Sequence, residues 1–139
     1  MPPVSNLSEI RITVRYSETD AMKFVYYANY QVYFEVARTA ALAQLGHPYS
    51  EMEKRQVLIP VLSAGCEYLK PGRYGDELII ATRRWRAGLA RIRFEYEVMR
   101  APGLELLARG HTEHAFMHPT GRPLRPPAEI IALFPRMAS

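Results

Sequence analysis

Apolar and polar residues alternate along residues 9–18, close to the beginning of the chain. The apolar positions fall on every second residue, at Ile10, Ile12, Val14 and Tyr16. Because successive side chains of a strand point to opposite faces, this alternation predicts a half-buried β-strand over 9–18. Residues 19–28 show no regular pattern, and we expect an irregular link there.

The apolar period changes to that of a helix between residues 28 and 45. Apolar side chains recur three or four positions apart and form one stripe, made of Tyr30, Tyr33, Phe34, Ala37 and Ala41. Asn29 is a candidate cap near the start, and Gly46 follows the last periodic residue. We therefore predict one long helix with a single apolar face.

Strand patterns separated by turn residues fill most of the remaining chain. The predicted strands cover 57–69, 77–86, 92–98 and 104–117. Glycine and proline mark the turns between these strands. Short helices are predicted at about 50–55 and, inside a proline-rich tail of residues 119–139, at about 128–134.

The order of elements is a strand, a helix and then four strands. This order favours an α+β architecture in which one long helix covers an antiparallel sheet of about five strands. No internal repeat or linker divides the sequence, so we expect a single domain over residues 1–139.

Composition narrows the class of protein. A net charge of +4 and an isoelectric point near 9.4 favour anionic partners, such as the phosphates of coenzyme A. Only three lysines occur and the basic residues are scattered, which argues against a nucleic-acid-binding module.

No apolar run is long enough for a membrane helix, and the N-terminus lacks the features of a signal peptide. With a single cysteine, Cys66, a reducing cytoplasm is the expected location.

Histidine and cysteine residues were considered as metal ligands or nucleophiles. His111, His114 and His118 cluster near the last predicted strand. His111 and His114 would point to opposite faces of that strand, so we expect no shared metal. Cys66 would point to the same face of its predicted strand as Leu62, and we interpret it as an inert, buried thiol.

Two sequence blocks carry a family resemblance. The first consists of Val14–Ala21 (VRYSETDA), Val25–Tyr30 (VYYANY) and Tyr33–Arg38 (YFEVAR). The second is Glu67–Asp76 (EYLKPGRYGD). In order and spacing these blocks resemble the signature of the 4-hydroxybenzoyl-CoA thioesterase family, and the resemblance covers nearly the whole chain.

The resemblance implies the hotdog fold, in which an antiparallel five-stranded sheet wraps around one long central helix. It also implies a thioester hydrolase that acts on acyl-CoA or on an acyl carrier protein thioester. Such enzymes form dimers or tetramers with active sites between subunits, and we expect a homotetramer. Coenzyme A is part of the substrate, so no separate cofactor and no metal is implied.

The resemblance also implies roles for individual residues. The catalytic carboxylate of the family falls on Asp20, and the oxyanion donor falls on the backbone N–H of Tyr27. The implied substrate-binding residues are Val25, Tyr26, Tyr30 and Arg91. The sequence departs from the usual pattern in three ways: Tyr27 replaces a common histidine and hints at aryl-CoA substrates, Met22 and Lys23 stand where glycine is common, and Arg91 replaces a serine.

Two chemical routes are open to Asp20. An ionised carboxylate can attack the thioester carbonyl to give a mixed anhydride, or it can activate a water molecule. A free N–H at a helix N-terminus would stabilise the charge on the carbonyl oxygen, and the loss of one such donor costs about 3–4 kcal/mol. A purely structural alternative for Asp20 is a turn or helix cap.

Two other functions are open to the same fold. A non-catalytic acyl-CoA-binding or sensor protein would bind thioesters without releasing thiol. A dehydratase would need a histidine near the helix entry, and none occurs between residues 1 and 46. 

Charged residues outside this motif have weaker assignments. Candidates for phosphate contacts are Arg73, Arg84, Arg86, Arg91 and Arg93. Glu35 and Arg38, three positions apart on the predicted helix, are interpreted as a structural ion pair rather than as site residues.

Overall fold

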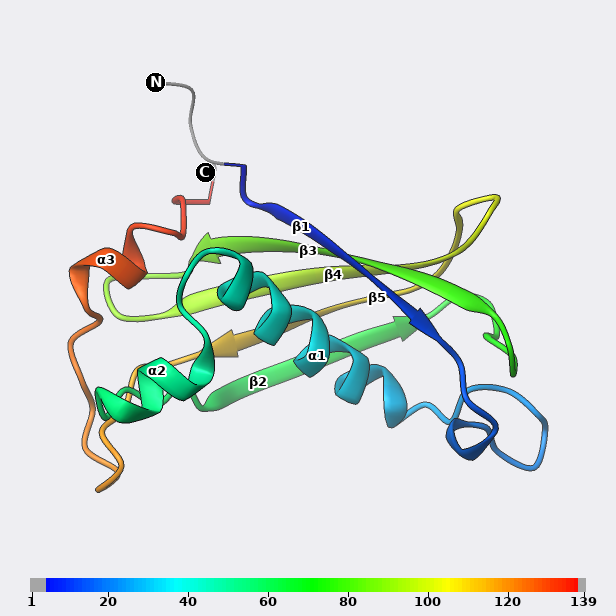
Figure 1. Cartoon of the computed structure of the whole chain (residues 1–139), viewed down its shortest axis with the longest axis horizontal. Coiled ribbons are helices and arrows are strands. Elements are labelled where there is room, and N and C mark those ends of the chain that lie inside the picture. Colours follow the sequence, from blue (N-terminus) through cyan, green and yellow to red (C-terminus); the bar gives the residue numbers. More distant parts are fainter. Residues whose placement is uncertain (1–4, 138–139) are drawn as a thin grey trace.

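The computed structural model describes residues 5–137 of the chain. Its five strands form one sheet in the order β1-β3-β4-β5-β2, and every neighbouring pair is antiparallel. One long helix, α1, lies across one face of this sheet (Figure 1). The strands are β1 Leu7–Thr13, β2 Val61–Tyr68, β3 Glu77–Arg86, β4 Ile92–Arg100 and β5 Glu105–His114.

The helix α1, Asn29–Gln44, is held against the sheet by its apolar stripe. The buried apolar side chains of this stripe are Tyr30, Tyr33, Phe34, Ala37, Ala41 and Leu42. The ring of Phe34 stacks on that of Tyr96 in β4, with centroids 4.3 Å apart. Gly110 in β5 allows this contact, because a Cβ at that position would lie 2.6 Å from the Phe34 ring. The predicted α+β class and the predicted long helix are confirmed.

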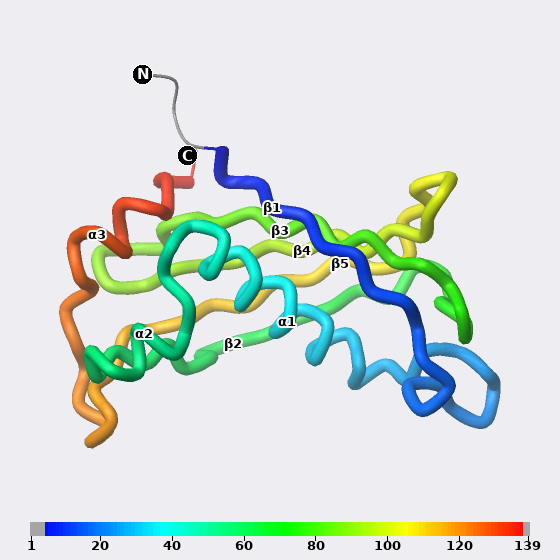
Figure 2. Tube along the Cα trace, viewed as in Figure 1, coloured from blue at the N-terminus to red at the C-terminus, as the bar shows by residue number. Residues whose placement is uncertain are grey.

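Two short helices and one 3-10 turn complete the chain: α2 Tyr49–Lys54, α3 Ala128–Ile131 and η1 Tyr16–Glu18. The trace places α2 and α3 at one end of the sheet, and the loop between β1 and α1 at the other (Figure 2). Within residues 5–137, no helix combines the length and the apolar character needed to cross a bilayer.

The first strand is shorter than its sequence pattern predicts. β1 ends at Thr13, and residues 16–18 form the turn η1 instead of continuing the strand. The N–H of Val14 still bonds to the carbonyl of Asp76 at 2.9 Å, but the chain then leaves the sheet. The side chain of Tyr16 is consequently 77% exposed. The prediction of a strand over 9–18 is therefore wrong beyond residue 13.

The proline-rich tail packs onto the sheet. Ile130 and Phe134 are fully buried, and the Phe134 ring lies edge-on to Phe94 of β4 at 5.5 Å. Arg86 fixes the end of the tail, because its Nε donates to the carbonyl of Phe134 at 2.9 Å. The tail therefore contributes Ile130 and Phe134 to the core.

Arg84, in the middle of this contact, is buried and bonds to both ends of the described chain. Its guanidinium donates to the carbonyl of Ser5 at 2.9 Å, to Oγ of Ser8 at 3.3 Å and to the carbonyl of Leu133 at 3.2 Å. These neutral acceptors satisfy a buried cation that cannot be deprotonated. All three nitrogens of Arg84 are thus engaged in the fold, which argues against a phosphate contact by this residue, whereas Arg86 uses only its Nε to hold the tail.

The strand β2 lies at an edge of the sheet. In the described part of the chain it pairs only with β5. Most of its residues are exposed, including the large apolar side chains of Val61, Leu62 and Tyr68. An exposed apolar edge strand is an unusual feature, because its free N–H and C=O groups can pair with another chain.

Candidate active site

The loop between β1 and α1 folds back on itself at one end of the sheet (Figure 1). Thr19 and Val25 form an antiparallel bridge across its neck, and Phe24 forms another with Arg73. The N–H of Val25 also bonds to the carbonyl of Gly72 at 2.8 Å. The loop is therefore anchored to itself and to the turn that precedes β3.

Asp20 lies at the centre of this loop and is half-buried. Its Oδ1 accepts hydrogen bonds from the N–H of Met22 at 2.9 Å and of Phe24 at 3.2 Å. Its Oδ2 accepts no hydrogen bond from residues 5–137. One carboxylate oxygen is thus fixed by the backbone while the other remains available.

Lys23 adopts the conformation that glycine usually takes in such a loop. Its φ is +67°, and its N–H bonds to the carbonyl of Asp20 at 2.9 Å. A non-glycine residue in this region costs about 1 kcal/mol. The tight turn around Asp20 is therefore formed without glycine, at a small cost in stability.

The start of α1 has no side-chain cap. The capping position is Ala28, whose methyl group cannot accept a hydrogen bond. Asn29, the predicted cap, instead donates from Nδ2 to the carbonyl of Glu18 at 2.8 Å, so that prediction is wrong. Among residues 5–137, no acceptor is found for the N–H groups of Tyr27 and Ala28. The positive end of the helix dipole is thus left open to a ligand.

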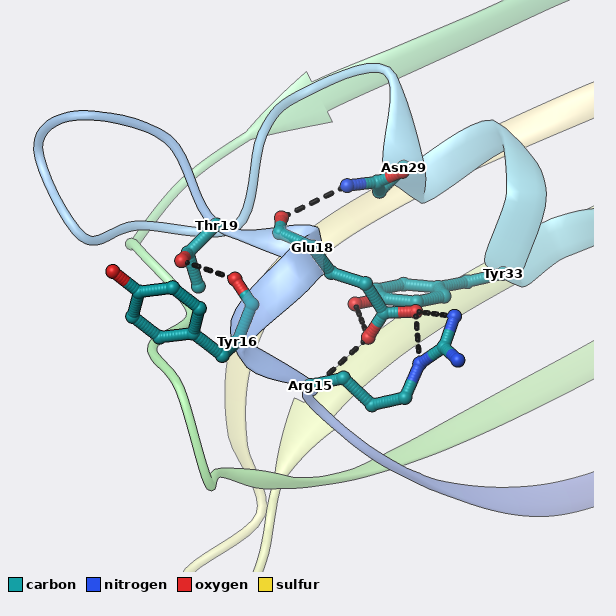
Figure 3. A network of polar contacts seen from close by, with 6 residues as sticks. All are labelled: Arg15, Tyr16, Glu18, Thr19, Asn29 and Tyr33. Carbon is teal, nitrogen blue, oxygen red and sulfur yellow. Dashed lines mark hydrogen bonds and ion pairs between the residues drawn. The ribbon is translucent and has the colours of Figure 1, made fainter.

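Glu18 ties this loop to the helix, as Figure 3 shows. Its Oε1 accepts from the N–H of Arg15 at 2.8 Å and from the hydroxyl of Tyr33 at 3.1 Å. Its own carbonyl accepts from the N–H of Tyr26 at 2.9 Å and from Asn29. Burial, together with the negative charge of Glu18, raises the pKa of the Tyr33 phenol, so this hydroxyl remains a donor. Sequence reasoning assigned no role to Glu18.

A cavity of about 280 Å³ opens beside Asp20 and the start of α1. Four of the predicted site residues line it: Asp20, Val25, Tyr27 and Tyr30. The remaining walls are Met22, Phe24, Tyr68, Leu69, Lys70 and Pro71. The structure therefore brings the predicted carboxylate and the predicted oxyanion residue to one cavity.

Tyr26 and Arg91 lie outside this lining. Tyr26 is exposed, and its ring packs against that of Tyr27 at 4.9 Å. The pKa of Tyr26 is raised mainly by the neighbouring Tyr27 hydroxyl and, to a smaller extent, by the charge of Asp20. Arg91 lies in the turn after β3, whereas the Asp20 loop adjoins the residues before β3. The length of that strand separates the two within one chain.

The aromatic ring of Tyr68 also lines the cavity, although sequence reasoning did not single this residue out. It comes from the end of β2, and its ring lies 6.2 Å from Tyr27 and 5.4 Å from Tyr30. The block Glu67–Asp76 was recognised in the sequence, but nothing in it indicated that β2 ends beside the helix. Strand pairing between β2 and β5 creates this contact.

Comparison with known proteins decides the family. Residues 14–134 match the model of the thioesterase-like superfamily. The chain belongs to this superfamily. The predicted family, the hotdog fold and the enzyme class of thioester hydrolase are thereby confirmed at the level of the family.

Three relatives illustrate this membership of the thioesterase-like superfamily. YneP of Bacillus subtilis (strain 168), a protein named for acyl-CoA thioesterase activity, is 48% identical over 77 residues, or 55% of this chain and 56% of YneP. A 1,4-dihydroxy-2-naphthoyl-CoA hydrolase of Rippkaea orientalis is 29% identical over 121 residues, covering 86% of this chain and 88% of that protein. The structure of 4-hydroxybenzoyl CoA thioesterase from Pseudomonas sp. strain CBS-3 superposes with a TM-score of 0.83 over 93% of this chain and 99% of that one, at 21% identity.

No histidine or cysteine of the described residues lines the cavity of this thioesterase-like chain, although the Cys66 thiol adjoins Tyr68. His114 is buried and bonds to Thr112 at 2.8 Å, whereas His111 covers Gly65 on the opposite face of the sheet. Their opposite orientation is as predicted. Cys66 is half-buried rather than buried, and desolvation raises the pKa of its thiol. A raised pKa disfavours the thiolate that a cysteine nucleophile needs.

Proposed function

We propose that this protein hydrolyses acyl-CoA thioesters, with Asp20 as the catalytic carboxylate and the Tyr27 N–H as the oxyanion donor. The observation that carries the proposal is the shared cavity of these two residues at an uncapped helix start. Superfamily membership supports the reaction class, and the name of YneP supports the acyl-CoA substrate. 

The geometry of Asp20 suits either of the two routes. Two backbone N–H groups hold Oδ1, which leaves Oδ2 to meet the thioester carbonyl or a water molecule. The thioester oxygen would then point at the N–H groups of Tyr27 and Ala28. Such fixed donors stabilise the developing charge without reorganisation, and this stabilisation is typically worth several kcal/mol. The thiolate of coenzyme A leaves readily and needs no strong acid.

An aromatic acyl group fits the lining of the cavity best. Phe24, Tyr27, Tyr30 and Tyr68 supply four rings around a space of about 280 Å³. Aromatic side chains favour offset or edge-on contacts with a flat ligand. The Rippkaea orientalis relative is named for an aryl-CoA substrate, which agrees with this choice. We therefore propose aryl-CoA over short aliphatic acyl-CoA, with acyl carrier protein as the less favoured carrier.

The exposed strand β2 supports a homo-oligomer, a dimer or a tetramer. Tyr68, the last residue of this exposed edge strand, also lines the cavity, as does Leu69, which follows it. Pairing of β2 with a second copy would cover the apolar edge and bring partner residues to the cavity rim. A role for Arg91 in substrate binding requires such a partner. Light scattering after size-exclusion chromatography would measure the assembly, and a monomer at micromolar concentration would contradict it.

The test of catalysis is thiol release by Asp20→Asn over a panel of aryl and aliphatic acyl-CoAs. We expect kcat to fall by at least about 100-fold, because general-base and nucleophilic roles contribute on this scale. Glu9→Gln, which removes an exposed carboxylate from β1, is the matched control and should keep wild-type turnover. Single turnover in ¹⁸O-labelled water identifies the nucleophilic route if ¹⁸O enters Asp20 and the acid stays unlabelled, because water has then attacked the aspartyl carbonyl of a mixed anhydride.

Two outcomes would contradict the proposal. Wild-type turnover by Asp20→Asn would exclude this carboxylate from the mechanism. Saturable acyl-CoA binding by the wild-type protein without any release of thiol would instead support the binding or sensor function.

A further inference from the structure

Arg38 is a buried cation that the proposed reaction does not use. It lies on α1 and is only 8% exposed. Sequence reasoning interpreted it as the partner of Glu35, but no such ion pair forms, and Glu35 is exposed to solvent. Among residues 5–137, no carboxylate lies within 4.0 Å of the Arg38 guanidinium. The prediction of a structural ion pair is therefore wrong.

The surroundings of Arg38 only partly compensate its charge. Burial opposes that charge, and the nearby hydroxyls of Tyr96 and Tyr49 outweigh this effect, so the pKa of the guanidinium lies above its ordinary value. Burial raises the pKa of the Tyr96 phenol, so this hydroxyl stays neutral and supplies no counter-charge. The Nε of Arg38 is buried and has no hydrogen-bond partner. A buried charge without a counter-charge is costly, and each such group calls for an explanation.

Arg38 lines a cavity of about 380 Å³ that is separate from the Asp20 cavity. The walls come from α1, α2, the link before β2 and the residue Met117. They are mainly apolar, being formed by Val57, Leu58, Ile59, Pro60, Val61 and Met117, with Tyr49 as a further hydroxyl. Glu35 and Glu53 also line the cavity, but both are exposed.

The two cavities lie at opposite ends of β2. The Arg38 cavity includes Val61 at the first residue of that strand, and the Asp20 cavity includes Tyr68 at its last. At roughly 3.3 Å per residue, the strand separates them by about 23 Å. They share no lining residue, so within one chain they are distinct sites.

We propose that the Arg38 cavity binds a small organic acid, whose carboxylate pairs with the guanidinium and whose apolar body contacts the surrounding walls. A carboxylate bound in the cavity supplies the missing counter-charge to the guanidinium, and Tyr49, which also lines the cavity, can donate a further hydrogen bond. Arginine suits this role because its planar fork matches carboxylate geometry. The exposed Glu35 and Glu53 disfavour ligands that carry a second negative charge at the mouth. The site does not depend on thioester hydrolysis.

The direct test is titration of the whole protein with benzoate and hexanoate, followed by calorimetry and by NMR of the Arg38 side-chain N–H. Benzamide and hexanamide have the same shapes without the charge. We expect saturable binding of the acids, at least about tenfold weaker binding of the amides, and a shift of the Arg38 Nε–H signal with the acids alone.

Substitutions assign the binding to this cavity. Arg38→Met should weaken acid binding at least about tenfold, and Arg38→Lys, which keeps the charge without the fork, should weaken it less. Arg83→Met removes an exposed guanidinium from the opposite face of the sheet and is the matched control. If Arg38→Met does not fold, two measurements still test the carboxylate site. These are acid binding by Arg38→Lys and the ratio of the wild-type affinities for the acids and the amides.

Asp20→Asn separates this inference from the proposed catalysis, because it should bind the acids as the wild type does. Equal binding of acids and amides would show an apolar pocket without a carboxylate site. Unchanged acid binding by Arg38→Met, or no acid binding by the wild type, would equally overturn the proposal.

Discussion

Replacement of Glu18 by glutamine should loosen the loop that carries Asp20. The Glu18 side chain is 14% exposed, and its Oε1 accepts from the Arg15 N–H and the Tyr33 hydroxyl. Its ion pair with the Arg15 guanidinium adds little, because the Arg15 side chain is 76% exposed. A hydrogen bond to a charged group contributes about 1.5–3 kcal/mol. Because glutamine keeps one neutral acceptor, we expect Glu18→Gln to lower the free energy of unfolding by about 2 kcal/mol.

Two measurements test this prediction. Urea denaturation gives the loss of stability, and thiol release from the best acyl-CoA substrate gives kcat/KM, which should fall as the Asp20 loop opens. Glu9→Gln on β1 is the control, since the Glu9 carboxylate is exposed and should be replaceable without effect. Tyr33→Phe removes one of the two Oε1 contacts and should couple with Glu18→Gln in a double-mutant cycle. Unaltered stability and activity in Glu18→Gln would refute the view that this carboxylate holds the loop.

Two further predictions concern the core. Burial lowers the pKa of His114 from 6.5 to about 4, so between these pH values the unfolded chain binds a proton that the folded chain does not. The free energy of unfolding should therefore fall by about 3 kcal/mol as the pH drops through this window. Urea titrations at several pH values should show this fall in the wild type and its loss in His114→Gln. Gly110→Ala would place a Cβ 2.6 Å from the Phe34 ring and should lower the free energy of unfolding by about 1–3 kcal/mol, measured by thermal denaturation. Gly65→Ala is the control, because its Cβ meets only the movable His111 ring and should destabilise the protein less. Equal losses of stability in the two variants would argue against the packing described.

The elements with the clearest periodicity were predicted best. The bounds of β3, Glu77–Arg86, agree with the predicted 77–86, and α1 differs from the predicted 28–45 by one residue at each end. β1 was overextended because Val14 and Tyr16 continue the alternation after the chain has left the sheet. The alternation shows only which side chains are apolar. The residue at which a strand ends depends on how far the adjacent strand continues to pair with it.

The site was predictable only where neighbouring residues form it. Asp20, Val25 and Tyr27 are close in sequence and carry the family motif, so all three were found. Tyr68 joins them through strand pairing, which no local pattern records. Arg38 was misinterpreted because its spacing from Glu35 is typical of a surface ion pair, whereas α1 turns its side chain toward Tyr96.

Arg84 has a consequence for how a growing chain can reach its final state. The acceptors of this guanidinium lie at residues 5, 8 and 133, so the last one is synthesised long after the first two. Until Leu133 has emerged from the ribosome, the centre of the sheet would enclose a cation with one acceptor missing. The nascent protein therefore completes the hydrogen bonding of this buried guanidinium only after residue 133 has been synthesised.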